Sequence, residues 1–364
     1  MREVTKMTVY QVVPNLSYGD GVGNDILAID RILKESGITT KIYAIVVDKK
    51  IDSKIVECFD NVPLLKNDDI LLYHYAVGSK ISSWFKQQRC KKVIIYHNIT
   101  PASFYEPYDR GAVEACQQGL KQIKALRSVT DYCIADSCFN KDDLRSYGFK
   151  GPIDVLPIII PFEDYEKTPN ANIINKYSDG MTNIIFTGRI APNKKQEDII
   201  LAFYYYQKFY NSKARLVLVG SYQENDKYYC RLRKLVDEIK LENVIFTGHI
   251  RFDEILAYYK TASLFLCMSE HEGFCIPLLE AMKFKLPIIA YDSTAVPETL
   301  GKAGICINTK NHLIIAGLMN RVIKDEKIQK VLIENEMERL EYFKYENIKR
   351  RFLACLDKIQ EVEK

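Results

Sequence analysis

The sequence has little that would indicate a membrane span, a structural metal or an extracellular disulfide framework. Nowhere do about 18 apolar residues follow one another, the length that a membrane-spanning helix needs. The first residues lack an apolar stretch followed by a small-residue cleavage site. The ten cysteines include no CxxC pair and no cluster with histidine, which indicates reduced thiols and no structural zinc. We therefore expect a cytoplasmic protein.

An excess of charge of one sign is also missing. The 51 Lys and Arg residues nearly balance the 47 Asp and Glu residues, and the net charge of +4 is far from the concentrated positive field of nucleic-acid binders. Tracts rich in Gly/Ser, Gln/Asn or Pro are absent too, which argues against disorder and fibrous repeats. The sequence predicts a globular protein whose main partner is not nucleic acid.

Length and pattern together predict two domains. The 364 residues are about twice what one ordinary core absorbs. Short β-branched runs alternate with segments of helical spacing, which predicts an α/β protein with parallel sheets covered on both faces. The alternation breaks at 163–181, where Asn, Asp and Gly accumulate. We predict a domain at 1–162, a linker at 163–181 and a second domain at 182–343, with a C-terminal helix at about 344–364 that packs back on the first domain.

A segment near residue 270 combines acidic side chains with the start of a helix. Glu272 lies in the loop before Pro277, which suits a first helical turn, and Glu280 follows in the first turns of that helix. Carboxylates accept hydrogens from sugar hydroxyls, and the amides of residues 273–276 at a helix N-terminus can bind phosphate, so the loop suits a sugar nucleotide. Alternatively, Glu280 only stabilises the helix N-terminus and Glu272 is a solvated loop residue.

A second segment places cations directly after a predicted strand. Gly188, Arg189 and Lys194 precede the next helical pattern. Arg189 and Lys194 can clamp a diphosphate, although basic residues in loops are commonly plain surface charges. Because open parallel sheets bind ligands beyond the carboxyl ends of their strands, both segments fit a ligand site there.

Together the two segments resemble the family 4 glycosyltransferases. Gly188-Arg189 with Lys194 matches that family's strand-Gly-Arg-loop-Lys motif, and Glu272 with Glu280 matches its Glu-x7-Glu motif, including the Gly-Phe and Leu-Glu-Ala-Met words inside it. The resemblance is clearest from about residue 183 to 305. It implies the GT-B fold, in which two doubly wound Rossmann-like domains face a central cleft, the first for the acceptor and the second for the nucleotide-sugar donor.

The resemblance also implies roles for individual residues. Arg189 and Lys194 would bind the donor diphosphate, Glu272 the hydroxyls of the transferred sugar, and Glu280 the ribose hydroxyls. The complete set of residues expected to bind the donor is Gly21, Gly23, Gly188, Arg189, Lys194, His249, Ile250, Glu272, Gly273, Phe274, Cys275, Ile276 and Glu280.

A histidine in the first half fits the same family. His97 ends a predicted strand, where the family often has a histidine facing the reacting sugar, and we expect it to be catalytic together with Arg189, Lys194 and Glu272. Without the family, a histidine at a strand end is usually hydrogen-bonded scaffold. Asp136 follows another strand and either faces the cleft or, like Ser137, caps the next helix.

A glycine-rich turn runs from Tyr18 to Asp25 and opens a predicted helix. It matches the family's loop beside the acceptor and the donor phosphate, because Gly21 and Gly23 permit close approach of the backbone. Ile26 stands where a dinucleotide-binding GxGxxG motif would have its third glycine, so an NAD-dependent enzyme is an alternative with an incomplete motif. A purely structural turn is equally open.

We expect a retaining glycosyltransferase that moves a hexose or deoxyhexose from GDP-mannose, a UDP-hexose or dTDP-rhamnose to a glycan or lipid-linked acceptor in surface polysaccharide assembly. We see no DxD-type acidic pair positioned for a metal ion, so we expect no metal and no other cofactor. The alternatives are a nucleotide-sugar 2-epimerase, a glycan phosphorylase, or a noncatalytic subunit that binds nucleotide sugars. The basic run from Lys86 to Lys92 would serve peripheral contact with the inner face of a membrane, or is a solvated turn.

Overall fold

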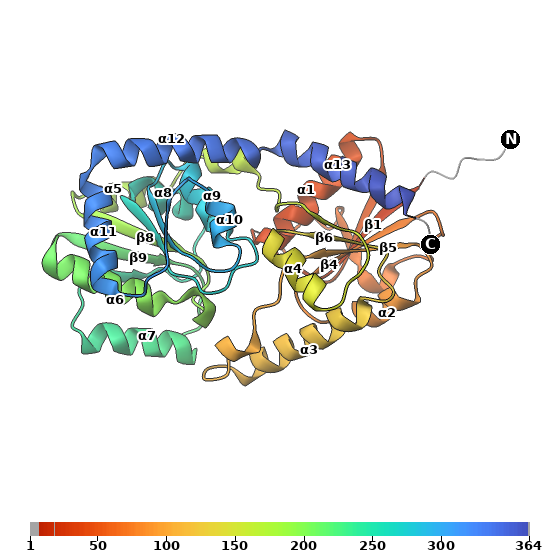
Figure 1. The fold of residues 1–364 in the computed structure, drawn as a ribbon, viewed down its shortest axis with the longest axis horizontal. Coiled ribbons are helices and arrows are strands. Elements are labelled where there is room, and N and C mark those ends of the chain that lie inside the picture. The colour runs from red at the N-terminus through yellow and green to blue at the C-terminus, as the bar shows by residue number, and fades with distance from the viewer. Residues whose placement is uncertain (1–6, 18, 363–364) are drawn as a thin grey trace. The chain divides into compact units, whose positions relative to one another are not determined.

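The computed structural model describes residues 7–17 and 19–362, and the chain divides into two compact units (Figure 1). Unit 1 comprises Met1–Ser103, Gly111–Pro161 and Phe343–Lys364. Unit 2 comprises Phe104–Arg110 and Phe162–Tyr342. Each unit is a parallel sheet with helices, as the alternating pattern predicts. Among the described residues, no helix is long and apolar enough to cross a membrane.

Unit 1 is built on seven parallel strands in the order β3-β2-β1-β4-β5-β6-β7. The strands are β1 (Thr8–Leu16), β2 (Thr39–Val47), β3 (Val56–Cys58), β4 (Ile70–Tyr75), β5 (Lys91–Tyr96), β6 (Tyr132–Ala135) and β7 (Ile153–Val155). The helices are α1 (Gly21–Glu35), α2 (Ile81–Gln87), α3 (Arg110–Leu126), α4 (Cys138–Ser146) and α13 (Tyr345–Glu361), with short 3-10 turns η1 (Phe59–Asn61) and η2 (Ala102–Phe104).

Helices cover both faces of this sheet, so most residues of its central strands are buried. All six residues of β4 are buried, which explains why that strand reads as an uninterrupted apolar and aromatic run. Ile70 and Leu72 pack with α1 and α13, whereas Leu71 and Tyr73 pack with α2, α3 and α4. Side chains of neighbouring residues in a strand point to opposite faces, which produces these two core clusters.

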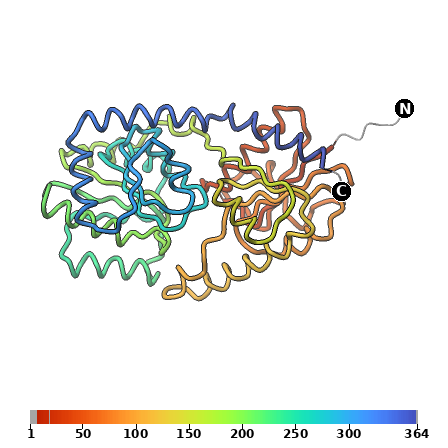
Figure 2. The backbone as a smooth tube through the Cα atoms, in the orientation of Figure 1, coloured from red at the N-terminus to blue at the C-terminus, as the bar shows by residue number. Residues whose placement is uncertain are grey.

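The C-terminal helix belongs to unit 1. Ile348, Phe352 and Leu356 of α13 are almost completely buried in the same cluster as Ile29 and Leu33 of α1. Figure 2 shows this blue helix lying beside the red N-terminal part of the unit. The chain therefore leaves unit 1, builds unit 2 and returns to finish the core of unit 1.

Unit 2 is built on six parallel strands in the order β10-β9-β8-β11-β12-β13. The strands are β8 (Thr182–Thr187), β9 (Ala214–Val219), β10 (Val244–Phe246), β11 (Leu264–Cys267), β12 (Ile288–Tyr291) and β13 (Ile305–Ile307). The helices are α5 (Ala171–Tyr177), α6 (Gln196–Phe209), α7 (Lys227–Glu238), α8 (Phe252–Thr261), α9 (Ile276–Lys283), α10 (Val296–Leu300), α11 (His312–Lys324) and α12 (Glu326–Tyr342), with 3-10 turns η3 (Phe162–Glu166) and η4 (Pro192–Lys194).

The segment 163–181, expected to be a linker, is folded and clusters with unit 2. It contains most of η3, all of α5 and a short turn before β8. Asn170 caps α5 by accepting hydrogen bonds from the amides of Asn172 and Ile173, and Tyr177 at the end of the helix is buried. The polar residues that resembled a linker are thus a helix cap and turn residues.

Candidate active site

The loop after β8 passes close to the loop after β9 and places a cation at the carboxyl edge of the unit 2 sheet. The Gly188 amide donates to the Val219 carbonyl at 2.8 Å. The neighbouring loop passes so close that a Cβ atom on Gly220, which has φ of 157°, would lie 2.0 Å from the Gly188 oxygen. Gly220 is therefore required for the two loops to meet, and sequence reasoning did not identify it.

Arg189, the next residue, is held by a tyrosine from a distant part of the chain. Its guanidinium Nη2 donates to the hydroxyl of Tyr105 at 3.1 Å, and Gln196 donates to its carbonyl at 3.1 Å. Tyr105 is buried and lies in the short segment Phe104–Arg110 that belongs to unit 2. Nothing in the local sequence around Tyr105 indicates this contact.

Lys194 and Glu272 form a tight ion pair between the loops after β8 and β11. The ammonium lies 2.7 Å from Oε1 and 2.6 Å from Oε2 of the carboxylate, and the two side chains are 21% and 8% exposed. Burial alone would lower the pKa of Lys194, but the charge and hydrogen bonds of Glu272, together with the neighbouring Cys275 and Cys267, raise that pKa above its ordinary value. The two strands are neighbours in the sheet, so residues 78 positions apart meet at one edge.

The loop that carries Glu272 is fixed by hydrogen bonds on both sides. The Glu272 amide donates to Thr294 Oγ1 at 2.9 Å, and Thr299 donates to the Phe274 carbonyl at 2.5 Å. Cys275 adopts a left-handed φ of 75° as the residue that precedes α9. This turn places Gly273 to Ile276 at the beginning of α9, as the sequence predicts.

Glu280 in α9 is held by two phenols. Tyr165 Oη donates to its Oε1 at 2.6 Å, and Tyr259 Oη donates to its Oε2 at 2.7 Å. Burial raises the pKa of Glu280, and these two hydrogen bonds lower it only in part. Each oxygen keeps a second lone pair, so the carboxylate retains capacity to accept from another hydroxyl.

The expected base-binding residues follow β10 in the same sheet. Gly248 has φ of 69° and forms a bridge with Gly220 from the loop after β9. His249 is exposed and Ile250 is half-buried. Unit 2 therefore gathers the predicted residues that follow β8, β10 and β11 along one edge, where parallel sheets bind their ligands.

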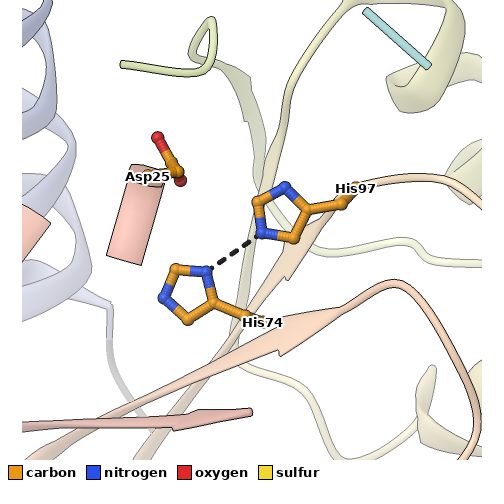
Figure 3. A group of neighbouring side chains, drawn as sticks. All are labelled: Asp25, His74 and His97. Carbon is orange, nitrogen blue, oxygen red and sulfur yellow. Dashed lines mark hydrogen bonds between the residues drawn. The ribbon is translucent and has the colours of Figure 1, made fainter. Parts of the chain in front are cut away.

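In unit 1, the side chain of His97 is buried and engages both of its ring nitrogens. Nδ1 lies 2.9 Å from Asp136 Oδ2, and Nε2 lies 3.0 Å from Nδ1 of His74. Figure 3 shows the hydrogen bond between the two histidines, with Asp25 nearby. The side chain of His97 is 1% exposed. Ser137 caps α4, as the capping alternative proposes, whereas Asp136 pairs with His97 instead.

Hydrogen bonds and close backbone contacts account for the glycine-rich turn. Asp20 caps α1 by accepting from the Gly23 amide, and a Cβ atom on Gly23 would lie 2.2 Å from the Ser17 carbonyl oxygen. Gly21 is the first residue of α1. Tyr18, the first residue of the predicted motif, lies outside the described residues. The structural alternative for this turn thus has direct support, and a ligand role for Gly21 and Gly23 stays a prediction.

Two groups of side chains bring potential metal-ligating atoms within 4.8 Å of one another. These are Asp25, His74 and His97 in unit 1, and Cys267, Glu272 and Cys275 in unit 2. The facing nitrogens of the histidines are hydrogen-bonded to each other, and Lys194 occupies both oxygens of Glu272. A metal cation would have to displace these contacts, which disfavours both groups as metal sites. The expected independence of metal stays a prediction.

Comparison with known proteins identifies the fold and a related family. In solved structures, HepE from Anabaena in complex with UDP-glucose superposes with a TM-score of 0.75 at 17% identity, covering 97% of this chain and all of that one. The two doubly wound units therefore have the GT-B fold. Residues 171–339 match the family described as "Glycosyl transferases group 1". This match lies within unit 2 and supports the resemblance to family 4 glycosyltransferases, whose expected GT-B fold is confirmed.

Curated relatives share part or most of the chain. The mannosyltransferase WbdA of Escherichia coli is 26% identical over 186 residues, which are 50% of this chain and 23% of that protein. The N-acetyl-alpha-D-glucosaminyl L-malate synthase of Bacillus anthracis is 24% identical over 326 residues, which are 85% of this chain and 80% of that one. This chain thus spans less than a quarter of the length of WbdA and most of the length of the synthase.

Proposed function

We propose that the protein transfers a hexose or deoxyhexose from a nucleotide-diphosphate sugar to a hydroxyl of a glycan or lipid-linked acceptor, with retention of the anomeric configuration. The supporting observation is the convergence of Arg189, Lys194, Glu272 and Glu280 at the carboxyl edge of one sheet, in the unit that matches the glycosyltransferase family. Cations, sugar-binding carboxylates and helix-terminal amides on one edge suit a ligand with both phosphate and hydroxyl groups.

Charge stabilisation is the main catalytic contribution of this unit. As the glycosidic bond breaks, negative charge develops on the departing diphosphate, and Arg189 and Lys194 would stabilise it without a metal. Glu272, already fixed by Lys194, would accept hydrogen bonds from hydroxyls of the transferred sugar. Glu280, oriented by its two tyrosines, would accept from the ribose. No enzymic nucleophile is part of this proposal, because front-side attack assisted by the departing phosphate needs none.

The donor base distinguishes three candidates. WbdA is described as a mannosyltransferase, which favours GDP-mannose, whereas the HepE structure contains UDP-glucose, which favours a UDP-hexose. dTDP-rhamnose is the third candidate. We place the reaction in the cytoplasm, in polysaccharide assembly, with the basic run from Lys86 to Lys92 as the surface for contact with the inner face of a membrane.

Thermal unfolding with GDP, UDP, dTDP or NAD, each with EDTA, tests the donor site. A nucleoside diphosphate that binds only the folded protein raises the midpoint, and EDTA leaves that rise unchanged if no metal takes part. Arg189→Ala should remove most of the rise, whereas Lys330→Ala, which changes a well-exposed cation on α12, should retain it. A rise with NAD alone would contradict the proposal.

Product analysis separates transfer from the alternatives of the same fold. A new glycoside formed from the stabilising donor supports transfer, and its anomeric configuration tests retention. A free epimer would identify an epimerase, and dependence on inorganic phosphate would identify a phosphorylase. Donor binding without any product, across a panel of glycan and lipid-linked acceptors, would indicate a noncatalytic subunit.

A further inference from the structure

Four neighbouring strands of unit 1 each contribute one side chain to a continuous row of hydrogen bonds. The row runs from Gln11 in β1 through His74 in β4 and His97 after β5 to Asp136 after β6. The distances are 3.0 Å, 3.0 Å and 2.9 Å along the row. All four side chains are buried, with at most 2% exposure. Water therefore contributes little to the hydrogen bonding of these groups.

The position of each proton in the row follows from its two ends. Gln11 uses its amide nitrogen to donate to the Ile26 carbonyl at 3.3 Å, so its oxygen faces His74 and accepts from Nε2. His74 therefore carries a proton on Nε2. Burial holds the pKa of His74 well below its usual range, which favours the neutral ring, so its Nδ1 is a bare acceptor. Since two bare nitrogens would repel each other at 3.0 Å, Nε2 of His97 must donate.

The other nitrogen of His97 faces a carboxylate. Nδ1 of His97 lies 2.9 Å from Asp136 Oδ2. Burial raises the pKa of Asp136, and the charge and hydrogen bond of His97 lower it in part. With Asp136 ionised, its carboxylate only accepts, so this nitrogen donates as well. A histidine that donates from both ring nitrogens is an imidazolium. The arrangement thus gives His97 a positive charge next to the negative charge of Asp136.

We propose that Gln11, His74 and Asp136 are positioning residues that hold His97 as a buried imidazolium, which serves the proposed sugar transfer as a fixed positive charge and donates no ring N–H to the substrate. The role in transfer rests on the function proposed above, whereas the charge state stands on the hydrogen bonds of the free protein. This assignment differs from a histidine whose ring nitrogen contacts the sugar, because both nitrogens already have protein partners.

The charged groups around His97 come from three elements. Asp136 contacts it directly, and Asp25 in α1 and the capping residue Asp20 also face it, with His74 on the remaining side. Burial by itself lowers the pKa of His97, but Asp136, Asp25 and Asp20 together raise it above the ordinary value. Burial holds the pKa of His74 well below its usual range, which agrees with a neutral His74. Burial raises the pKa of Asp25 to about 7.

The geometry favours a proton over a metal ion between the two rings. A zinc ion bound by both nitrogens at about 2.0–2.1 Å needs two bare nitrogens, with room for the ion away from the line that joins them. The nearly parallel rings, 8° apart, and the 3.0 Å separation suit a direct N–H···N hydrogen bond. The test below makes metal binding a distinct outcome.

Nitrogen NMR of the full chain labelled with ¹⁵N-histidine reads the charge state directly. The chain has five histidines, so replacing His97 by Gln identifies its signals. At pH 7 we expect both nitrogens of His97 to be protonated and His74 to carry its proton on Nε2 only. A neutral His97 would overturn the proposal, and so would signals of both rings that change when EDTA removes a metal.

Variants of His74 and Asp136 test the role in transfer. His74→Leu removes the acceptor for His97 Nε2, whereas His74→Gln supplies an amide oxygen in its place. We expect kcat to fall about 100-fold in His74→Leu and Asp136→Asn, with the KM for the donor nearly unchanged, and His74→Gln to recover most of the loss. His312→Gln, a histidine replacement in unit 2, serves as the control.

The pH profile separates positioning from a merely structural effect. The imidazolium is lost as pH rises through the raised pKa of His97, so kcat should fall at alkaline pH. Asp136→Asn should move this limb to lower pH by about one unit or more, because it removes the main counter-charge. An unmoved limb would overturn the proposed role. A protein that transfers no sugar but shows the expected NMR signals would refute the proposed function while leaving the charge assignment intact.

Discussion

The two units present polar residues at the carboxyl edges of similar sheets, but they hold them in different ways. In unit 1, Gln11, His74, His97 and Asp136 lie on or directly after strands and are almost completely buried. In unit 2, Arg189, Lys194 and Glu272 lie on loops, and Lys194 remains 21% exposed. The first set is fixed before any ligand arrives, whereas the second can exchange its partners for those of a ligand. The fully buried network of unit 1 therefore suits a fixed charge state, whereas the set in unit 2, whose cations Arg189 and Lys194 remain accessible, suits ligand binding.

The largest expected effect comes from weakening the core of unit 1 while nucleotide binding by unit 2 is measured. Phe352 of α13 is completely buried, so Phe352→Ala should lower the unfolding free energy by about 3–5 kcal/mol. Urea unfolding measures the loss, and nucleotide-dependent stabilisation reports on unit 2, which should persist. Asp357→Ala, an exposed position in the same helix, is the control. If Phe352→Ala also abolished the nucleotide-dependent stabilisation, the two units would not behave independently.

Removing the cation of unit 2 should reduce transfer with little effect on unit 1. Lys194→Ala takes away charge that would stabilise the departing diphosphate, and it leaves Glu272 without its ion-pair partner. We expect the transfer rate to fall about 100-fold or more. Lys330→Ala provides a matched control, since Lys330 faces Glu334 in an exposed pair at 4.0 Å. An unchanged rate in Lys194→Ala would remove this residue from the donor site.

A buried carboxyl in unit 2 should make the free energy of unfolding fall as the pH rises. Glu336 in α12 is completely buried, and neither oxygen has a hydrogen-bond partner among the described residues. Burial raises its pKa to about 9, above the ordinary value of 4.5. Its contribution to stability is therefore fully present below about pH 4.5 and is lost as pH rises through about 9.

The expected slope is at most about 1.4 kcal/mol per pH unit between these values. Chemical unfolding at several pH values measures it, and Glu336→Gln should abolish the part that Glu336 causes. Glu334→Gln, an exposed position two residues away in α12, should leave the slope unchanged. The same slope in wild type and Glu336→Gln would show that this carboxyl ionises in contact with water.

The smallest expected effect concerns the orientation of Glu280. Tyr165→Phe and Tyr259→Phe each remove one hydrogen bond from this carboxylate and leave the aromatic packing in place. We expect donor affinity to fall by about 2-fold to 10-fold, the equivalent of one hydrogen bond. Titration calorimetry with the stabilising nucleoside diphosphate measures it. Tyr204→Phe on α6, whose hydroxyl accepts a hydrogen bond from the exposed Lys208, is the control. Tighter donor binding in Tyr165→Phe would show that the phenol competes with the ribose.

The sequence predicts features that depend on local spacing and misses those that depend on distant strands. Glu272 and Glu280 are recognisable because they lie eight positions apart, in a loop and in the helix that follows it. The α/β class is recognisable because β-branched runs alternate with segments of helical spacing. Tyr105 and Tyr165 are not, because tyrosine is common here, with 24 copies, and each reaches its partner across more than 80 positions. His74 lies in a wholly buried strand, where its neighbours indicate only core.

The return of α13 to unit 1 has a consequence for synthesis. Translation proceeds at about 5–20 residues per second from the N-terminus, so the strands of unit 1 are made first and the helix that closes one of their faces is made last. Nearly all of unit 2 is a single stretch, from Phe162 to Tyr342, and is complete before that helix emerges. The half of the protein that is made first is therefore the half that finishes folding last, and the sheet face that α1 and α13 share is only partly covered until α13 is made.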